Sequence, residues 1–280
     1  MLADYHIHTE FSDDSEEKME TAVVRAIAAG LDEICFTDHV DYGIKLDHDE
    51  FKAMDEEEQR KFSNLLNVNY PEYIKEINRL KELYRGQICI KTGLEFGIQM
   101  HTIPRYQKLL AACPLDFVIL SCHQVEDREF WNYEFQKGRT ADEYNTRYYQ
   151  EIYNCVCNYR DYSVLGHLDM IQRYNETRYP FEKSQAVIEK ILARAIADNK
   201  GIEVNTSSFR YGLTDLMPER RILKLYHDMG GHIITIGSDA HRAGDIDEQI
   251  PYIQSELKKI GYQHFCTFER MKPVFHELAV

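Results

Sequence analysis

Histidines and carboxylates recur in this chain where strands are predicted to end, and these side chains are the usual ligands of divalent metal ions. The chain opens with Asp4-Tyr5-His6-Ile7-His8 and carries Ser238-Asp239-Ala240-His241 near its other end. Residues two apart in a strand point to the same side, so each run predicts a two-pronged ligand pair. Further candidates lie between the two pairs: Asp38, His39, Glu95, His123 and His167. Together they predict a hydrolytic site with several metal ions.

The elements that must position these groups follow a repeating pattern of strand and helix. Short apolar runs alternate with longer amphipathic stretches, which is typical of βα units. Strands are predicted at 3–8, 33–39, 88–96, 117–123, 164–169, 202–206 and 232–239. Helices are predicted near 17–29, 71–85, 103–112, 141–158, 182–199 and 218–229. We therefore predict an α/β barrel of seven repeats, followed by a helix at 251–260 and a late strand at 264–269 that either covers the barrel or closes it.

The candidate ligands follow the rule for such barrels, whose functional groups come from the C-terminal ends of strands and the loops beyond. Six of the 12 histidines fall on one ring in this way, whereas a chance distribution would scatter them. Asp38 and His39 are adjacent, so on a regular strand only one faces the interior. We predict that His39 is a ligand and that Asp38 holds a ligand imidazole by its other nitrogen. Asp13 and Asp14 could bind metal or cap the helix that follows.

Length, composition and net charge argue against other classes of function for this chain, such as membrane spanning and nucleic-acid binding. A length of 280 residues suits one barrel, and 44% hydrophobic with 29% charged residues is typical of a globular protein. No run approaches the roughly 20 apolar residues of a membrane span, and the N-terminus lacks a signal-peptide pattern, so we expect a cytoplasmic protein without a membrane partner. The net charge of −14 argues against nucleic-acid binding, but bound cations would still allow a small anionic substrate.

The segment at about 41–70 does not fit the repeat. It is rich in Asp, Glu and Lys and follows the second predicted strand. Two interpretations stay open, a lid at the active-site face and a solvated surface excursion. Because we find no internal repeat and no low-complexity linker, we expect a single domain over 1–280 with this insertion.

The motifs also resemble a known family. The order of motifs in the polymerase and histidinol phosphatase (PHP) family is matched by His6-x-His8, Asp14, Thr37-Asp38-His39, Glu95, His123, Gly166-His167-Leu168-Asp169 and Asp239-x-His241. The runs 166–174, 203–207 and 272–275, together with the insertion after the second strand, are similar to the histidinol-phosphatase branch. The resemblance implies a distorted (β/α)7 TIM-like barrel of the PHP type with three divalent metal ions.

The resemblance further implies a ligand set for each ion. Four strand-end donors would hold the first ion: His6, His8, Glu95 and Asp239. Glu95 would bridge to a second ion, which two further imidazoles would hold: His123 and His167. The third ion would take the remaining donors: Asp14, His39 and His241. Some family members have histidine in place of Asp14, and an oxygen ligand suits harder ions, so zinc, manganese or iron, or a mixture of them, is expected.

A site of this kind suits hydrolysis of a phosphate monoester, which is very slow in water and needs charge neutralisation and a placed hydroxide. We expect direct attack by a metal-bridging hydroxide without a phospho-enzyme, with Glu95, Asp239 and His241 as catalytic ligands. The resemblance implies L-histidinol phosphate as the small-molecule substrate, releasing L-histidinol and phosphate in histidine biosynthesis.

Three residues outside the ring are candidates for substrate binding. Arg173 and Arg210 are expected on loops at the catalytic face, where each could grip phosphate bidentately or simply pair with a surface carboxylate. Glu126, three residues after His123, could meet a substrate amine or imidazole, or could be a surface carboxylate.

Other functions stay open from the sequence. The same metals could act on nucleotides, DNA ends or other small phosphate esters, although the acidic charge counts against DNA. A catalytically silent metal-binding module is a second alternative. Structural metal sites are normally closed by four ligands, whereas the candidate ligands here form a ring drawn from six strands. Hydrolysis of a C–N bond on a similar scaffold is a further alternative, but glutamate rather than lysine at position 95 favours the phosphatase.

Overall fold

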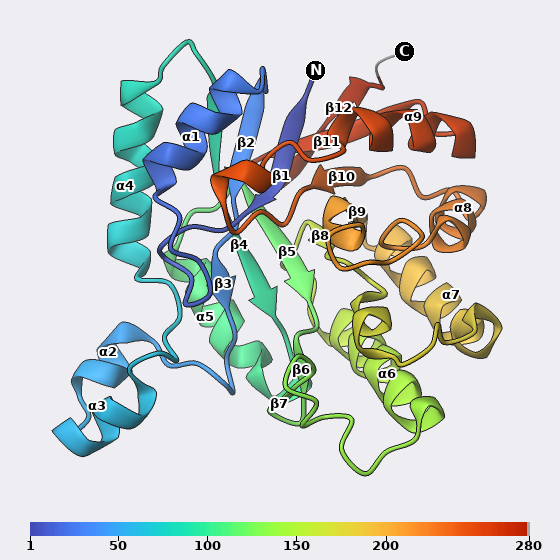
Figure 1. Cartoon of the computed structure of the whole chain (residues 1–280), viewed down its shortest axis with the longest axis horizontal. Coiled ribbons are helices and arrows are strands. Elements are labelled where there is room, and N and C mark those ends of the chain that lie inside the picture. The colour runs from blue at the N-terminus through green and yellow to red at the C-terminus, as the bar shows by residue number, and fades with distance from the viewer. Residues whose placement is uncertain (279–280) are drawn as a thin grey trace.

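A parallel sheet that curls into a nearly closed barrel forms the centre of the computed structural model, which describes residues 1–278 (Figure 1). Seven strands follow one another around it: β1 (Ala3–Ile7), β2 (Glu33–Phe36), β4 (Cys89–Gly97), β5 (Phe117–Ser121), β8 (Val164–Leu165), β9 (Gly201–Asn205) and β10 (Ile234–Gly237). The short strand β3 (His39–Val40) pairs with β4, beyond β2. A parallel bridge between Ile7 and Ala240 brings the end of β10 to β1. The predicted seven-stranded barrel is thus confirmed.

Helices cover the outside of this sheet, since nearly every strand residue is buried and both faces must be shielded from water. They are α1 (Met19–Ala28), α4 (Tyr70–Leu83), α5 (Ile103–Ala112), α6 (Ala141–Asn158), α7 (Phe181–Ala197), α8 (Arg220–Asp228) and α9 (Ile250–Ile260). Each buries one apolar stripe, as α7 does with Ile188, Ile191 and Leu192. Within residues 1–278, none of the helices combines the length and apolar character needed to cross a bilayer.

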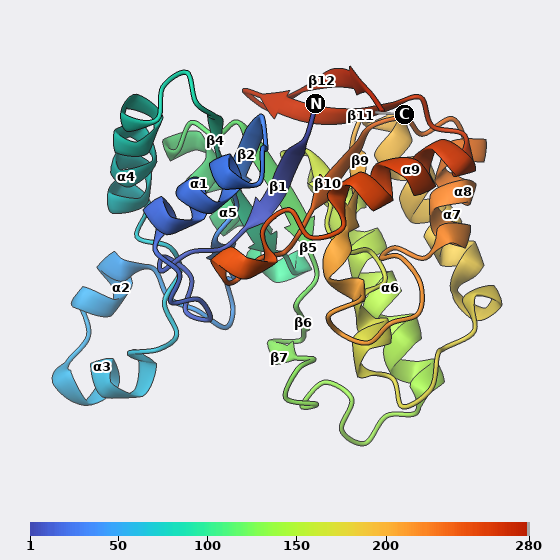
Figure 2. The ribbon, with the colours of Figure 1, turned by 45° about the horizontal axis from the view of Figure 1, so that its top comes forward.

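The C-terminal segment covers one end of the barrel and does not enter its sheet. Strands β11 (His264–Glu269) and β12 (Lys272–Glu277) form an antiparallel hairpin that lies across the end where the barrel strands begin (Figure 2). Phe268 is buried against Phe117, with ring centroids 5.0 Å apart, and its backbone N–H donates to the Tyr5 hydroxyl at 2.8 Å. Of the two predicted roles, covering the barrel is therefore correct. The second strand of the hairpin was not predicted.

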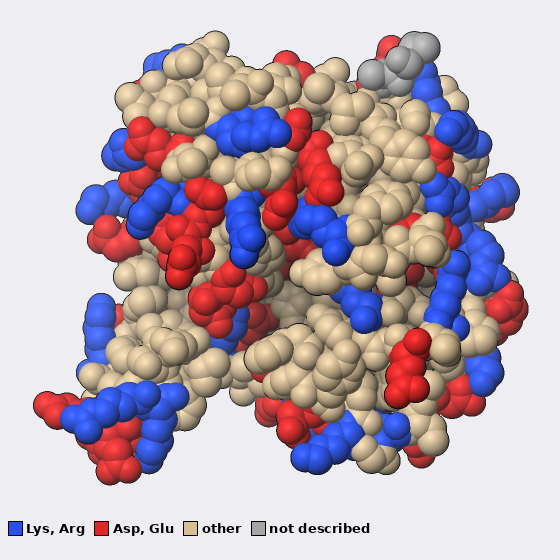
Figure 3. Space-filling view, viewed as in Figure 1, with Lys and Arg blue, Asp and Glu red and all other residues tan. Residues whose placement is uncertain are grey.

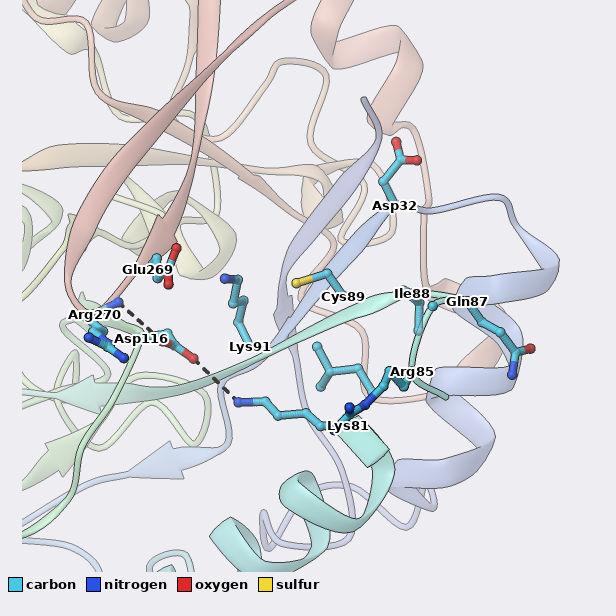
Figure 4. Close-up of a pocket in the computed structure, with 12 residues that line it drawn as sticks. Asp32, Lys81, Arg85, Gln87, Ile88, Cys89, Lys91, Asp116, Glu269 and Arg270 are labelled. Carbon is cyan, nitrogen blue, oxygen red and sulfur yellow. Dashed lines mark hydrogen bonds and ion pairs between the residues drawn. The ribbon is translucent and has the colours of Figure 1, made fainter. Parts of the chain in front are cut away.

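A polar cleft of about 680 Å³ opens beside this hairpin, at the end of the barrel away from the candidate ligands (Figure 4). Two of its charged groups, Lys81 and Asp116, are engaged with each other. Lys81 donates to the Thr92 hydroxyl at 2.9 Å and lies 3.6 Å from the Asp116 carboxylate, which also accepts from the backbone N–H of Arg270. These contacts tie the hairpin tip to the sheet, which agrees with the stabilising role usual for this end of a barrel.

The segment 41–70 leaves the barrel after β3 and carries two short helices, α2 (His48–Lys52) and α3 (Glu56–Phe62), which project from the body of the molecule (Figure 1). The Asp55 carboxylate caps α3 by accepting from the backbone N–H groups of Glu57 and Glu58, both at 2.9 Å. Figure 3 shows the surface hollowed between this excursion and the barrel, with acidic side chains at the edge of the hollow. Its role as a lid stays a prediction.

Candidate metal centre

The carboxylate of Glu95, near the C-terminal end of β4, is the centre of the candidate site. This side chain is fully buried, and imidazoles surround both of its oxygens. Five imidazole nitrogens lie near a Glu95 oxygen, at 3.2 Å for His6, 3.5 Å for His8, 3.1 Å for His39, 3.1 Å for His123 and 2.8 Å for His167. Residues from five separate predicted strands are therefore brought within one small buried volume.

Two aspartates complete the cluster from opposite ends of the chain. The Asp239 carboxylate lies 3.6 Å from His6 Nε2 and 3.4 Å from His8 Nε2. Asp14 Oδ2 lies 3.3 Å from His39 Nε2 and 3.1 Å from His241 Nε2. Of the two adjacent aspartates after β1, the structure thus brings Asp14 to the imidazoles. Helix α1 begins at Met19, so the alternative that the aspartates cap it is wrong.

Asp13 instead faces the excursion. Its Oδ1 accepts from the Lys45 ammonium at 2.5 Å, and the same ammonium lies 2.9 Å from Asp41 Oδ2. Lys45 is buried and lines the cleft at the candidate site together with Asn64 and Leu65. The excursion therefore supplies one wall of this cleft, and the ion pair of Lys45 with Asp13 joins it to the loop after β1.

The backbone at the strand ends departs from the predicted strand geometry. Strand β10 ends at Gly237, and Asp239 adopts a left-handed conformation with φ 56°, so strand periodicity does not explain why Asp239 and His241 converge. A turn positions them instead. In the same way β8 ends at Leu165, and His167 follows it with φ 22° rather than lying in the strand as predicted. Such irregular backbone is common at functional sites.

Two carboxylates that the sequence did not point to fix the orientation of the imidazoles. Glu203 Oε1 lies 2.5 Å from His6 Nδ1, and Asp41 Oδ1 lies 2.8 Å from His123 Nδ1. Holding Nδ1–H in this way turns each Nε2 lone pair toward Glu95, as metal-bound histidines require. Glycine at position 97 makes room for this contact, since a Cβ there would lie 1.9 Å from Asp41 Oδ1. The sequence did offer a signal for these two carboxylates, since Glu203 lies in a predicted strand and Asp41 follows the predicted ligand His39 by two residues.

Asp38 does not play the predicted role. Its Oδ1 accepts from the backbone N–H of Thr9 and from the Ser12 hydroxyl, both at 2.7 Å. Ser12 in turn lies 3.4 Å from His8 Nδ1 and accepts from the backbone N–H of His39. Asp38 therefore secures the loop after β1 and acts on the imidazoles only indirectly, through Ser12.

The arrangement fits a divalent cation. Four atoms that surround the centre of the cluster are buried and make no hydrogen bond within the described residues: His6 Nε2, His8 Nε2, His39 Nδ1 and Glu95 Oε2. A buried polar atom without a partner costs about 1–3 kcal/mol, so a cluster of them calls for a ligand. Three groups have ligand atoms within 4.8 Å of one another and mix nitrogen with oxygen: His6 with His8 and Asp239, His6 with Glu95 and His167, and His39 with Glu95 and His123. Such donor sets suit zinc, manganese or iron.

The close packing of imidazoles and carboxylates shifts the pKa values of the cluster in both directions. Burial by itself would raise the pKa of Glu95, but the surrounding imidazoles of His6, His123 and His39 hold it well below its usual range. Burial lowers the pKa of His8 well below its usual value, and its neighbours His241 and His39 add to this effect. Glu95 and His8 therefore have the ionised and neutral forms in which a carboxylate and an imidazole bind metal, whereas nearby carboxylates raise the pKa of His6, His39 and His123.

Arg173 lies in the cleft beside the cluster, on the 3-10 helix η2 (Met170–Tyr174). Its guanidinium donates to the Ser207 hydroxyl at 2.7 Å and to Asp239 Oδ2 at 3.2 Å, and it stacks 3.9 Å above the Tyr211 ring. The structure therefore brings this candidate for phosphate binding to the centre.

The other two candidates for substrate binding lie elsewhere. Arg210 donates to the carbonyl oxygens of Ser238 and Asp239, at 2.8 and 2.7 Å, and pairs with Glu248, so it fixes the turn after β10 and does not line the cleft. Glu126 pairs with two arginines at the surface, Arg139 at 2.7 Å and Arg147 at 3.2 Å. The structure thus agrees with the alternative of a surface carboxylate, and a contact of Glu126 with substrate stays an untested prediction.

The sequence of this chain is similar to those of known proteins. Residues 4–207 match the PHP domain family. The chain belongs to the PHP family. Among PHP proteins, a histidinol-phosphatase of Lactococcus lactis is 33% identical over 273 residues, which cover 96% of this chain and 95% of that protein. A histidinol-phosphatase of Bacillus subtilis is 26% identical over 271 residues, covering 87% of this chain and 94% of its own length.

Solved structures of PHP proteins share the fold. The crystal structure of a histidinol phosphate phosphatase from Lactococcus lactis, in complex with zinc, L-histidinol and phosphate, has a TM-score of 0.84 at 33% identity and covers 98% of both chains. A structure from Listeria monocytogenes has a TM-score of 0.73 at 22% identity, covering 88% of this chain and 97% of the other. The predicted PHP-type barrel is confirmed.

Replacing Asp41 by asparagine tests how His123 is held. We expect metal affinity to fall about 10–100-fold, since second carboxylates of this kind orient the ligand imidazole and raise its basicity. Competition with a chelator measures the affinity, and Asp142→Asn is the control, because Asp142 is exposed and pairs with Lys183 rather than with a candidate ligand. Equal affinity in both variants would show that His123 needs no such partner.

Proposed function

We propose that this chain is a metal-dependent phosphomonoesterase that hydrolyses L-histidinol phosphate to L-histidinol and phosphate. One observation carries the proposal. Across 98% of its length the chain is 33% identical, with a TM-score of 0.84, to a histidinol phosphate phosphatase whose structure holds zinc, L-histidinol and phosphate. The buried cluster around Glu95 supports the same chemistry, because phosphate-ester hydrolysis needs concentrated positive charge that such donors can hold.

Nine side chains would hold three divalent ions in this proposal: His6, His8, Asp14, His39, Glu95, His123, His167, Asp239 and His241. Bound there, the ions would neutralise phosphate oxygens and lower the pKa of a coordinated water to about 7. Glu95 is central because its two oxygens face different imidazoles, Oε2 toward His6, His8 and His39 and Oε1 toward His123 and His167. Zinc, manganese and iron all suit this mixture of donors.

Arg173 would bind the phosphate directly. It is almost fully enclosed, and its Nε makes no hydrogen bond within the described residues, although its terminal nitrogen is held by Ser207 and Asp239. A guanidinium fixed in this way presents donors to phosphate oxygens without losing much conformational freedom. Hydrolysis then forms a bond from the water oxygen to phosphorus and breaks the ester P–O bond, and the departing alcohol oxygen takes a proton.

The proposal also covers the segment beside the cleft and the cellular role of the protein. The segment 41–70 is proposed to act as a lid, because Lys45, Asn64 and Leu65 already form one wall of the cleft. A cytoplasmic location and a role in histidine biosynthesis belong to the same proposal. Figure 3 shows acidic and basic side chains interspersed on the face in view, without a continuous basic band of the kind that binds nucleic acid.

A substrate panel tests this function. The metal-loaded protein should hydrolyse L-histidinol phosphate with a kcat/KM at least about 100-fold above that for sugar phosphates, nucleotides and single-stranded DNA, because a site built for polar groups rejects substrates that lack them. Released phosphate is the readout. Equal, slow release from every monoester would contradict the substrate and favour a general phosphoesterase. No release from any ester would contradict the phosphatase activity itself.

A further inference from the structure

A second cavity lies on the other side of η2 from the cleft of the metal centre. It has a volume of about 210 Å³ and is lined by residues of two segments, 169–178 and 212–219. Side chains three apart in a 3-10 helix lie on the same face, so Asp169 and Gln172 line this cavity while Arg173 lines the cleft. The two hollows therefore share η2 as a wall but use different side chains of it.

The carboxylate of Asp169 is a buried charge at the wall of this cavity. The residue is 4% exposed, and its Oδ2 accepts from the backbone N–H of Glu219 at 2.9 Å, which joins the start of η2 to the start of α8. Within residues 1–278 its Oδ1 makes no hydrogen bond, and the carboxylate forms no ion pair. A buried charge without a partner is costly, so this carboxylate calls for a positive counter-charge.

Two further carboxylates of the cavity wall already have counter-charges. Asp215 pairs with Arg178 at 3.3 Å and with Arg220 at 2.5 Å. Glu219 pairs with Arg178 as well, and with Arg221 at 2.8 Å. These arginines are therefore engaged with other carboxylates. Among the described residues, a single buried negative charge of the cavity is left without a cation to balance it.

We propose that this cavity binds one monovalent cation, potassium or ammonium, beside Asp169 Oδ1. One positive charge balances one carboxylate, whereas divalent ions are usually bound tightly where several charged ligands converge. The cavity has room for the ion and several waters, since one water needs on the order of 10–15 Å³ of such space. Thr177 and Thr214, which carry hydroxyl oxygens, line the same cavity. The last carboxylate of the lining, Glu176, is exposed, so water and salt screen its charge.

The cation also positions Arg173. Asp169 directly precedes η2, which carries this arginine, and the segment 212–219 directly follows Tyr211, on whose ring the guanidinium stacks at 3.9 Å. The two parts of the chain that hold the guanidinium thus meet at the cavity, and a balanced charge there stabilises their junction. This link to Arg173 rests on the proposed function, whereas the cation site itself does not.

Thermal unfolding of the metal-loaded protein in different salts tests the site. At about ten times the Kd of potassium or ammonium, we expect a Tm about 3–6 °C higher than in tetramethylammonium chloride of equal ionic strength, because the bulky ion cannot reach a buried carboxylate. In Asp169→Asn, which keeps the size of the side chain and an acceptor for the Glu219 N–H, the difference should vanish. Glu176→Gln is the control, since it removes an exposed carboxylate of the same cavity and should keep the difference.

Crystals of the wild-type protein soaked in rubidium chloride give a direct readout that does not depend on the folding of a variant. An anomalous peak in the cavity beside Asp169 Oδ1 is expected. Three results would each overturn the site: no difference in Tm between the salts for the wild type, an equal difference in Asp169→Asn, or no rubidium beside this carboxylate. The carboxyl group would then hold a proton or water instead.

Phosphate release tests the link to Arg173 separately. At equal ionic strength, kcat/KM for L-histidinol phosphate should be about 5–10-fold higher in potassium or ammonium than in tetramethylammonium. In Arg173→Met this ratio should fall to near one while the difference in Tm remains. No stimulation in the wild type, or the same stimulation in Arg173→Met, would overturn the link to Arg173. If the wild type does not hydrolyse the ester at all, the proposed function falls, while the Tm and rubidium results still decide the cation site.

Discussion

Replacing Glu95 by glutamine is expected to lower kcat/KM by about 10³-fold or more and to reduce the bound metal at the same time. Glutamine keeps the size of the side chain but removes the negative charge that five imidazoles surround. A neutral amide is a poor ligand for a divalent cation, and its NH2 group would face imidazole nitrogens instead of balancing a shared charge. Metal content by mass spectrometry and phosphate release measure the two effects.

Glu151→Gln provides the matched control. Glu151 is also a buried glutamate, but it accepts from the backbone N–H of Met100 and pairs with Arg147, neither of which is a candidate metal ligand. We expect its metal content and turnover to stay near wild type. Full activity and full metal content in Glu95→Gln would mean that Glu95 does not bridge the ions.

Replacing Arg173 by methionine is expected to lower kcat/KM about 10²–10³-fold while metal content stays unchanged, because donors aimed at developing phosphate charge are worth this much in other enzymes. Methionine keeps much of the apolar stem that packs against Tyr211 but removes the guanidinium. Arg173→Lys should recover part of the activity, since it restores the charge without the two-pronged geometry. Single-turnover and steady-state assays with metal analysis measure the effect.

Arg128→Met is the control for this variant, because Arg128 is exposed in the hairpin of β6 (Gln124–Val125) and β7 (Arg128–Glu129) and does not line the cleft. The alternative outcome is informative. If Arg173→Met loses metal and activity in the same proportion, the main task of Arg173 is to hold Asp239 through their 3.2 Å contact, and another group binds the phosphate.

Much of the architecture was predictable because it rests on local periodicity. The predicted helices at 103–112 and 141–158 coincide with α5 and α6, and the seven barrel strands occur in the expected order. Strand ends were less predictable, as β8 and β10 stop before His167 and Asp239, whose left-handed backbone no hydrophobic pattern encodes. Strand β12 was missed because it is mostly exposed and contains Pro273, so it lacks the alternation of a half-buried strand.

The sequence by itself determined which side chains could form the candidate centre. Residue type and position after an apolar run were enough to select His6, Glu95 and Asp239, because barrel strands all end at one face. The tertiary structure alone decided their partners. Glu203 serves His6, and Asp41 serves His123, through the register of neighbouring strands and the close approach that Gly97 permits.

The same division holds at the mouth of the cleft. From the sequence, Glu126 and Glu129 are equivalent carboxylates a few residues beyond His123. Only the folded hairpin separates them, since its left-handed turn directs Glu126 to Arg139 while pairing brings Glu129 back beside the imidazoles. Side-chain direction in a turn depends on backbone angles that composition and spacing do not specify, and for this reason the sequence could not tell which of the two carboxylates lines the cleft.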